Sequence, residues 1–376
     1  MRVLHLVSDL GQGGAQTYVL DLLRQHEKHP GIESELLAMF YKGALWNNIE
    51  KLGITASCLG MRGALDISGM YRLYRHLVAG DYDIVHVHHI HPAVSMLVGW
   101  LRGSNVYTEH GGGLLGGGRL EKLVYKWFHM NYCRFIAISR EMGQVMTAVN
   151  PVIRNKIQVI HNGVDLDKID ALAAAEVSTL PALFGEAPLR VGIIGRLEPQ
   201  KRIDTFIETA SLIATKRGDV IFPVIGDGSL LESLTAKSKQ LGIGEKVLFL
   251  GYRTNAIAIM KHFDIFLFTS DYEPFGLVIV EAMAAGIPVV ALHKQGAIPE
   301  IIDDGIEGYV VKTGGAVALA ERAMKLLADP GLRKRMARAA RLKVEAQFTM
   351  QHNASRVLTA YHECLKPLKT GGLKSP

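Results

Sequence analysis

Two glutamates separated by seven residues, Glu273 and Glu281, are the residues best suited to chemistry in this 376-residue chain. A strand pattern precedes them, and a helical pattern begins near residue 277 and ends before Gly286. Glu273 then lies on the loop before the helix, and Glu281 about one turn inside it. The first amides of such a helix suit a diphosphate, because they carry partial positive charge and have no acceptor within the helix. They belong to Phe275, Gly276 and Leu277.

Two cations follow an earlier strand pattern, Arg196 directly and Lys201 five positions later. Both can therefore face one cleft. In the first half, Gly11, Gly13 and Gly14 follow the first strand pattern. Gln16 stands where G-x-G-x-x-G requires glycine, so no nicotinamide dinucleotide site is predicted.

Short β-rich runs alternate with longer helical patterns in both halves, which predicts βαβ units with parallel sheets. We therefore expect an α/β protein with two Rossmann-like domains that face each other across a cleft. The predicted domains are residues 1–175 and 189–348, joined by a linker at 176–188 that is rich in small residues and proline. Residues 349–376 hold a helix able to cross back to the first domain, and a tail. Such sheets bind ligands at the carboxyl ends of their strands.

The order of short motifs over nearly the whole chain resembles the retaining glycosyltransferases of family four, which have the GT-B fold. The run EPFGLVIVEAMAAGIPVV, residues 273–290, carries most of this resemblance. The other matching pieces are Gly13-Gly14-Ala15, Glu109-His110-Gly111, Ala137-Ile138-Ser139, His161-Asn162-Gly163-Val164-Asp165, Gly195-Arg196-Leu197 with Lys201, and Gly226-Asp227-Gly228.

The resemblance implies transfer of a hexosyl group from a nucleoside-diphosphate sugar on the second domain to an acceptor on the first. Glu281 would bind the ribose hydroxyls and Glu273 the hydroxyls of the transferred sugar. Arg196 and Lys201 would clamp the diphosphate, a task for which the family generally needs no metal, and no cofactor is implied. Gly13 and Gly14 would be donor-binding residues, because they let the first helix bring its backbone amides close to phosphate or acceptor. His110 would lie beside the sugar. Transfer would be a same-face substitution with retention, in which the leaving phosphate oxygen takes the acceptor proton.

The resemblance also places the segment from Tyr252 to Asn255, with Arg253, near the base. A neutral Asn255 favours uracil over guanine, so we expect a UDP-sugar rather than a GDP-sugar donor. The acceptor class stays open between a glycan, a lipid-linked acceptor and a small molecule. Two alternatives remain beside the transferase: a nucleotide-sugar epimerase on the same fold, and a non-catalytic nucleotide-sugar-binding subunit.

The net charge of +6 suits an anionic partner such as a nucleotide diphosphate, a lipid phosphate or an acidic membrane. The three cysteines lack C-x-x-C spacing, so neither a disulfide framework nor a zinc site is expected. A reduced, cytoplasmic location fits this best. No stretch reaches the roughly 20 apolar residues that span a bilayer, so membrane contact would be peripheral, at the inner face.

Residues 119–132 are basic and aromatic and allow two interpretations, a membrane-surface helix or a core helix, of which the second is favoured. The basic run at residues 333–343 predicts a solvated helix and no nucleic-acid partner, because aromatic residues are not interleaved with it. Four histidines, His86, His88, His89 and His91, raise the question of a metal site. No carboxylate or cysteine pattern joins them, so structural or cleft-lining histidines are expected, and no metal.

Overall fold

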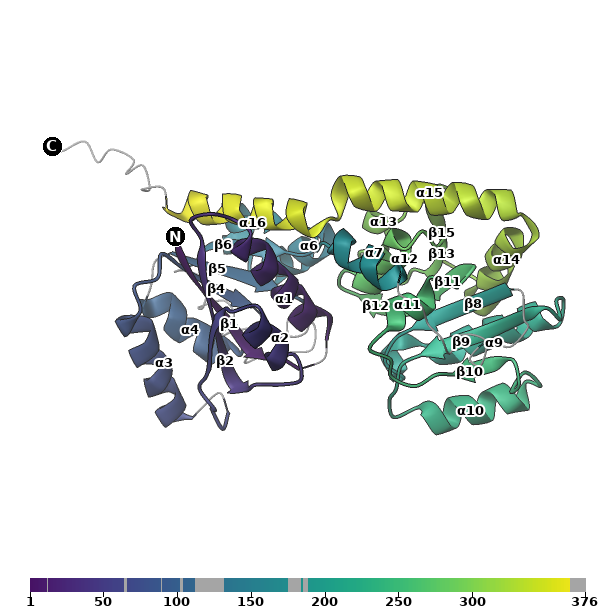
Figure 1. Cartoon of the computed structure of the whole chain (residues 1–376), viewed down its shortest axis with the longest axis horizontal. Coiled ribbons are helices and arrows are strands. Elements are labelled where there is room, and N and C mark those ends of the chain that lie inside the picture. The colour runs from purple at the N-terminus through teal and green to yellow at the C-terminus, as the bar shows by residue number, and fades with distance from the viewer. Residues whose placement is uncertain are drawn as a thin grey trace. The chain divides into compact units, whose positions relative to one another are not determined.

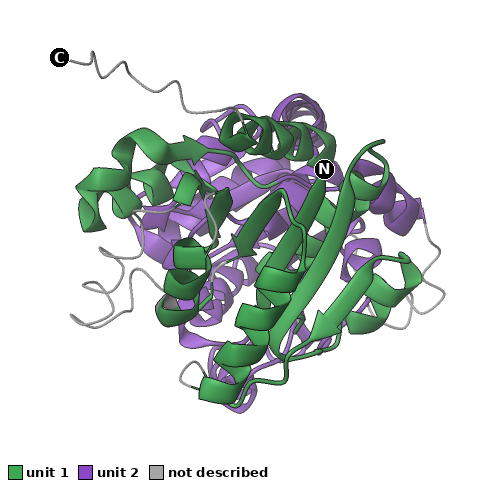
Figure 2. Cartoon of the chain, turned by 90° about the vertical axis from the view of Figure 1, so that its left-hand side faces the viewer, with its two compact units in different colours: residues 1–162, 350–376 green, residues 163–349 purple. Residues whose placement is uncertain are grey.

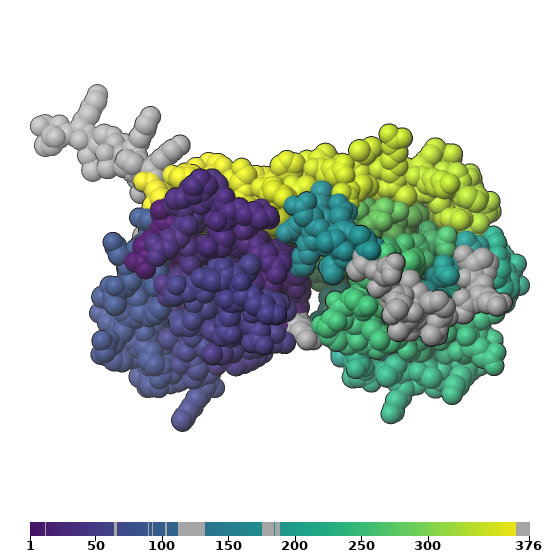
Figure 3. All heavy atoms as spheres, in the orientation of Figure 1, coloured from purple at the N-terminus to yellow at the C-terminus, as the bar shows by residue number. Residues whose placement is uncertain are grey.

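The computed structural model describes residues 1–11, 13–63, 66–88, 90–101, 104–111, 132–174, 184 and 189–365 (Figure 1). The chain forms two compact units (Figure 2), and Figure 3 shows their atoms as spheres. Unit 1 comprises Met1–Asn162 and Met350–Pro376, and unit 2 comprises Gly163–Thr349.

Unit 2 begins at Gly163, ahead of the predicted domain limit at residue 175. Helix α7 (Leu166–Ala174) packs on helices of unit 2, and Asp170 forms an ion pair with Arg341 at 2.6 Å. These contacts attach residues 163–174 to unit 2, which periodicity alone does not reveal. The predicted linker at 176–188 lies outside the described residues, apart from residue 184.

Unit 1 is built on a seven-stranded parallel sheet with the order β3-β2-β1-β4-β5-β6-β7. Its strands are β1 (Arg2–Asp9), β2 (Glu33–Tyr41), β3 (Thr55–Cys58), β4 (Ile84–His88), β5 (Asn105–Glu109), β6 (Tyr132–Ala137) and β7 (Ile157–Val159). Its helices are α1 (Gly14–Glu27), α2 (Trp46–Lys51), α3 (Ile67–Ala79), α4 (Pro92–Leu101), α6 (Arg140–Val149), the 3-10 helix η2 (Pro151–Lys156) and α16 (Met350–Leu365). Strands β4 and β5 are buried along their whole length, as expected when helices cover both faces of a parallel sheet.

Helix α16 returns to unit 1 and packs beside α1 (Figure 1). Asn353 of α16 accepts a hydrogen bond from Tyr18 Oη at 3.0 Å, and Tyr361 Oη lies 2.5 Å from His86 Nδ1. A disulfide joins Cys133 of β6 to Cys364 of α16, with a Cα–Cα distance of 5.6 Å.

This disulfide corrects the expectation of unpaired cysteines. Cys133 and Cys364 are 231 residues apart, and only the return of α16 over the sheet makes them neighbours, so spacing rules could not find the pair. Disulfides persist in oxidising compartments, and the cysteine content therefore no longer supports a reduced one.

Unit 2 has a six-stranded parallel sheet with the order β10-β9-β8-β11-β13-β15, and a separate pair β12-β14. Its strands are β8 (Leu189–Ile194), β9 (Val220–Ile225), β10 (Val247–Phe249), β11 (Ile265–Phe268), β12 (Tyr272–Glu273), β13 (Val289–Leu292), β14 (Gln295–Gly296) and β15 (Gly308–Val311). Besides α7, its helices are η3 (Pro199–Lys201, 3-10), α9 (Ile203–Ala214), α10 (Leu231–Gln240), α11 (Ala256–Met260), α12 (Leu277–Ala284), α13 (Ile298–Ile301), α14 (Gly315–Ala328) and α15 (Pro330–Gln347). Phe206, Phe222 and Leu267 belong to its buried core.

The two sheets share the order of six strands, to which unit 1 adds β7 at one edge, and this confirms the prediction of two Rossmann-like folds. In each, the order reverses direction at one point, between β1 and β4 in unit 1 and between β8 and β11 in unit 2. Ligands of doubly wound sheets bind at the carboxyl ends of the strands at this point. Among the described residues, no helix has both the length and the apolar composition to cross a membrane.

Candidate functional site

The site in unit 2 centres on an ion pair between Lys201 and Glu273. Lys201 ends η3, in the loop that follows β8, and Glu273 lies in the loop that follows β11. Lys201 Nζ lies 2.7 Å from Glu273 Oε2, and the two side chains are 19% and 17% exposed. Thr269 Oγ1 donates to the Lys201 carbonyl at 2.8 Å, and Gln200 Nε2 donates to the Tyr272 carbonyl at 3.0 Å. The structure therefore joins the two loops at the reversal point of the sheet.

Glu273 is held by the parallel pairing of β12 with β14, in which it lies opposite Gly296. Gly296 has φ of 109°, and a Cβ atom there would come 2.1 Å from the Glu273 carbonyl oxygen. The Glu273 carbonyl also accepts from Ala297 N at 3.1 Å. Only glycine permits this approach, so Gly296 fixes the backbone that carries the carboxylate.

Helix α12 begins directly after this loop. Gly276 precedes it with φ of 96° and ψ of 53°, a left-handed conformation that favours glycine. The first amides of an α-helix lack acceptors within it, and Gly276 and Leu277 provide the first of α12. The Phe275 side chain is buried against Phe348, so only its backbone is available to a ligand. Glu281 is half-buried one turn into α12, where the sequence predicted it.

Arg196 lies exposed at the carboxyl end of β8. The adjoining loop is tightly packed, because a Cβ atom on Gly226 would come 1.9 Å from the Gly195 carbonyl oxygen. Leu197 N donates to the Asp227 carbonyl at 2.9 Å. Two motifs that were weak in the sequence are therefore neighbours. Arg253 lies on the exposed loop after β10, where its Nε donates to the Leu250 carbonyl at 2.8 Å.

Besides Gly296, sequence reasoning missed Arg202, Asp204 and Lys294, which support this site. Arg202 has φ of 49° and, among the described residues, is the one non-glycine residue with positive φ. Its guanidinium bonds Asp204 at 3.0 Å and Asp271 at 3.2 Å, and Lys294 Nζ also reaches Asp271. This network joins the start of α9 to the loop that carries Glu273. A backbone angle leaves no mark in sequence spacing, so no signal could have identified Arg202.

Unit 1 has a cavity of about 310 Å³ at its own reversal point. Its lining residues are Val7, Ser8, Asp9, Ala15, Gln16, Val19, His88 and His110. Gly13 caps α1 without a side-chain hydrogen bond, and Gly14 begins the helix, so its first amides lie beside the cavity. His110 follows β5 and is half-buried, with its ring 5.2 Å from that of Tyr18. The structure therefore brings Gly13, Gly14 and His110 to one place.

A chain of imidazoles leads from this cavity into the core. His110 Nε2 lies 3.4 Å from His88 Nδ1, His88 Nε2 lies 3.0 Å from His5 Nδ1, and His5 Nε2 lies 3.3 Å from His26 Nδ1. Burial lowers the pKa of His5 and His88 well below the usual range and that of His26 to about 4. A neutral imidazole has one N–H, so these bonds must all run in one direction along the chain. The tautomer of His110 is thereby tied to that of the buried rings.

The histidine arrangement differs in part from the expected one. His86 is buried and bonds Tyr361 and Thr108, whereas His91 accepts from Ala93 N at the start of α4. His89 lies outside the described residues. Side-chain nitrogens of His5, His86 and His88 lie within 4.8 Å of one another, close enough to share an ion. Each ring already has hydrogen-bond partners here, so the arrangement is explained without a metal.

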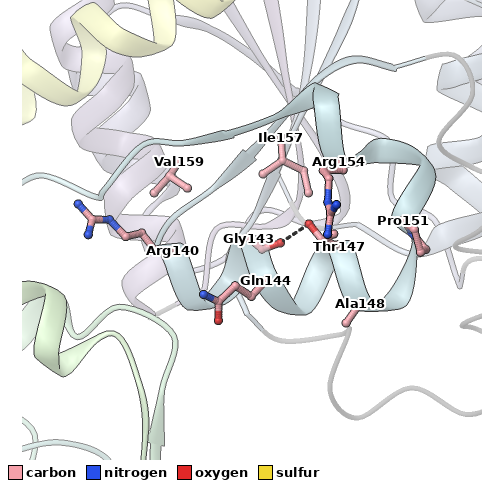
Figure 4. Close-up of a pocket in the computed structure, with 9 residues that line it drawn as sticks. All are labelled: Arg140, Gly143, Gln144, Thr147, Ala148, Pro151, Arg154, Ile157 and Val159. Carbon is pink, nitrogen blue, oxygen red and sulfur yellow. Dashed lines mark hydrogen bonds between the residues drawn. The ribbon is translucent and has the colours of Figure 1, made fainter.

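A larger cavity, of about 660 Å³, lies between α6 and β7 (Figure 4). Arg140 and Arg154 flank it, with Gly143 and Thr147 between them. Its lining contains none of the predicted site residues, and β7 is the edge strand of the sheet. We therefore place the site at the reversal points. The basic aromatic segment at 119–132 lies outside the described residues except for Tyr132.

Two family models match the chain in succession. Residues 12–168 match glycosyltransferase family 4, and residues 181–343 match glycosyl transferases group 1. The chain is 30% identical over 310 residues to D-inositol 3-phosphate glycosyltransferase of Mycobacterium leprae, covering 76% of this chain and 70% of that enzyme. It is 30% identical over 243 residues to N-acetyl-alpha-D-glucosaminyl L-malate synthase of Bacillus anthracis, covering 61% of this chain and 62% of the relative.

Solved structures share the fold at low sequence identity. Anabaena Alr3699/HepE, crystallised with UDP and glucose, superposes with a TM-score of 0.83 at 22% identity, covering 96% of this chain and 99% of that one. A glycosyltransferase from Rickettsia africae also gives a TM-score of 0.83, at 21% identity and with 98% and 99% coverage.

Proposed function

This chain is a glycosyltransferase of family four with the GT-B fold, and we propose that it transfers a hexosyl group from a UDP-sugar with retention of configuration. The observation that carries the proposal is the Lys201–Glu273 pair at the reversal point of the unit 2 sheet. In this pair, a cation that could bind phosphate lies beside a carboxylate that could bind sugar hydroxyls. The phosphate and the sugar are likewise adjacent in a nucleotide sugar.

Each residue at this edge suits one part of the donor. Lys201 and the exposed Arg196 would neutralise the diphosphate, and the first amides of α12 would bind its oxygens. Glu273 would accept from hydroxyls of the transferred sugar and Glu281 from those of the ribose. Arg253, beside Asn255, would meet the base. The cations act most strongly in the transition state, because the leaving diphosphate gains charge as the anomeric bond breaks.

Transfer would proceed on one face of the sugar. The bond between the anomeric carbon and the phosphate oxygen breaks, and the acceptor oxygen bonds the same carbon from the same side. The acceptor proton passes to the leaving phosphate oxygen, so UDP leaves without a covalent enzyme intermediate. We assign His110 to the transferred sugar, and the first amides of α1, which follow Gly13 and Gly14, to the phosphate or the acceptor, since Ala15, Gln16 and His110 line one cavity of unit 1.

Named relatives and neighbours support the donor class. A relative from Escherichia coli, 28% identical over 262 residues, is a UDP-Gal:alpha-D-GlcNAc-diphosphoundecaprenol alpha-1,3-galactosyltransferase. Anabaena Alr3699/HepE was crystallised with UDP-glucose. For this chain the acceptor would be a glycan, a lipid-linked molecule or a small molecule.

The test measures thermal stabilisation by UDP, GDP and NAD at equal concentrations, because a ligand that binds only the folded state raises the Tm. We expect a shift with UDP that exceeds the shift with GDP, and none with NAD. Nuclear magnetic resonance of the product then reports its anomeric configuration. An inverted product contradicts the same-face mechanism. Interconversion of two UDP-sugars without acceptor would favour the epimerase, and UDP binding without turnover would favour a non-catalytic subunit.

A further inference from the structure

Unit 1 carries an exposed apolar surface that the donor and acceptor chemistry does not use. On α3, Ile67, Tyr71, Tyr74 and Val78 are 85%, 60%, 40% and 58% exposed. Their spacing of four, three and four residues places them in one stripe along the helix. The opposite face of α3 buries Leu73 and Leu77 in the core. The exposed stripe is therefore additional to the face that α3 needs for folding.

Helix α4 extends this surface, because it packs beside α3 (Figure 1). Met96 and Trp100 are 47% and 78% exposed. The sequence of α4, PAVSMLVGWL, contains no charged residue. A partly exposed helix of a water-soluble surface usually carries charges on its outer face. We call the six residues of the two helices the α3–α4 surface.

The ionisable side chains that α3 itself carries are all basic, and the nearby carboxylates of Asp66 and Glu35 are paired with Arg72 and His76. Helix α3 contains Arg72, Arg75 and His76 and no carboxylate. Arg72 is engaged, since its Nε donates to the Leu59 carbonyl at 3.2 Å. Arg75 is exposed, and no partner is recorded for it among the described residues. Asp66, at the start of α3, is committed to capping, because it accepts from Gly69 N at 3.0 Å.

We infer that the α3–α4 surface binds an anionic lipid bilayer, with Tyr71, Tyr74 and Trp100 at the level of the headgroups and Arg75 beside the lipid phosphates. Tyrosine and tryptophan concentrate at membrane interfaces, because one end of each side chain is apolar and the other polar. Basic side chains near an anionic bilayer add further attraction. A symmetric contact with a second copy fits less well, since it would bring arginines together without a carboxylate.

The position of the surface connects it to the acceptor. Crossovers in parallel sheets are right-handed, so helices on either side of the reversal point cover opposite faces of the sheet. The α3–α4 surface therefore lies on the face of the sheet opposite α1 and α16. Helix α4 follows β4, whose last residue His88 lines the acceptor-side cavity. Binding to the bilayer is inferred from the surface itself. The inference rests on the proposed function only where it adds that a lipid-linked acceptor would be bound here.

The experiment measures sedimentation of the full-length protein with vesicles. Vesicles of equimolar phosphatidylglycerol and phosphatidylcholine are compared with vesicles of phosphatidylcholine alone. We expect binding to the anionic vesicles that weakens with salt. The double variant Tyr71→Ser/Trp100→Ser should bind about tenfold more weakly, because it removes apolar contact area. Arg75→Gln should bind about fivefold more weakly.

Matched controls come from unit 2. Val317 is 57% exposed and Arg335 has a 70% exposed side chain. Val317→Ser therefore removes an exposed apolar side chain, and Arg335→Gln an exposed cation, outside the α3–α4 surface. All replaced side chains are exposed, and every variant should keep the wild-type Tm. Absence of vesicle binding, or binding that the surface variants leave unchanged, overturns the inference. So does self-association that Tyr71→Ser/Trp100→Ser abolishes, which would assign the surface to a second copy.

The stabilisation by UDP is measured on the same samples. Vesicle binding with no UDP effect would refute the proposed donor and leave the bilayer surface standing. A UDP effect without vesicle binding would refute the surface and leave the donor.

Discussion

Lys201 Nζ lies 2.7 Å from Glu273 Oε2, and the two residues come from different loops 72 positions apart in sequence. Both side chains are about four-fifths buried, so water screens the pair less than it would a fully exposed one. A nucleotide sugar would take Lys201 to its diphosphate and Glu273 to its hydroxyls. In the absence of donor, the ion pair therefore holds both side chains in place. When the donor binds, each side chain would exchange its partner for a group of the nucleotide sugar.

Replacements of the two partners should have opposite effects on binding of UDP. Lys201→Ala removes the phosphate cation and leaves a carboxylate nearby, so UDP should bind more weakly and kcat/KM should fall by about 100-fold or more. Glu273→Gln frees Lys201 from its competing carboxylate, so UDP should bind equally well or more tightly while turnover of the UDP-sugar falls. Calorimetric titration with UDP and initial-rate kinetics measure the two effects.

The control for this prediction is Lys237→Ala, since Lys237 forms a surface ion pair with Glu208 on neighbouring helices. It should leave both measurements at wild-type values. Equal loss of UDP affinity in Lys201→Ala and Glu273→Gln would show that the pair only stabilises the fold.

Gly296 should be essential for the site through its backbone. A Cβ atom in Gly296→Ala would lie 2.1 Å from the Glu273 carbonyl oxygen, so the β12–β14 pair must open. Gly305 also has positive φ, 86°, but has open space around its Cβ position. Both alanine variants should lose about 1 kcal/mol from backbone strain, whereas Gly296→Ala alone should lose transferase activity and binding of the UDP-sugar. Similar activity in the two variants would refute this role of Gly296.

Much of this arrangement could be predicted from sequence, because loops that follow parallel strands all lie at the same edge of the sheet. Arg196, Lys201 and Glu273 each follow a strand pattern, and the carboxyl ends of parallel strands share one edge of the sheet. The pairing of Lys201 with Glu273 could not be predicted, because it depends on which two loops meet at the reversal of strand order. Gly296 was missed for the same reason, since its partner lies on another loop.

Other features required the tertiary fold itself. The bond from Cys133 to Cys364 exists because α16 returns to unit 1. The return of α16 to the first domain could be expected from the sequence. The alignment of α16 with β6, which brings Cys364 to Cys133, could not. His5 and His26 were also missed, since each is a lone histidine in its element and only packing brings the rings together.

The buried histidines should make unit 1 sensitive to acid. Burial lowers the pKa of His26 to about 4, with a further contribution from His29, whereas in the unfolded chain it titrates near 6.5. Between these values the unfolded state binds the extra proton, so stability is complete above about pH 6.5 and falls as the pH drops toward 4. Between pH 6.5 and 4, His26 alone should lower the free energy of unfolding by up to about 1.4 kcal/mol per pH unit. The pKa values of His5, His86 and His88 are also lowered, so these residues act in the same direction.

Urea unfolding followed by tryptophan fluorescence measures this effect, because all three tryptophans, Trp46, Trp100 and Trp127, fall within the sequence of unit 1. His26→Gln should reduce the dependence of the free energy of unfolding on pH between 4.5 and 6. The control is His362→Gln, at an exposed position on α16. A dependence that His26→Gln leaves unchanged would mean that His26 stays protonated in the folded protein.

The disulfide between Cys133 and Cys364 should stabilise unit 1, because it ties α16 to β6 across 231 residues and restricts the unfolded chain. Cys364→Ser should lower the free energy of unfolding of unit 1 by about 2–4 kcal/mol, measured by the same fluorescence. Dithiothreitol should lower it in the wild type and leave Cys364→Ser unchanged. Cys58→Ser is the control, since Cys58 is the free cysteine and its variant should retain the sensitivity to reductant. Three thiols titrating in the unfolded protein without reductant would show that the bond does not form.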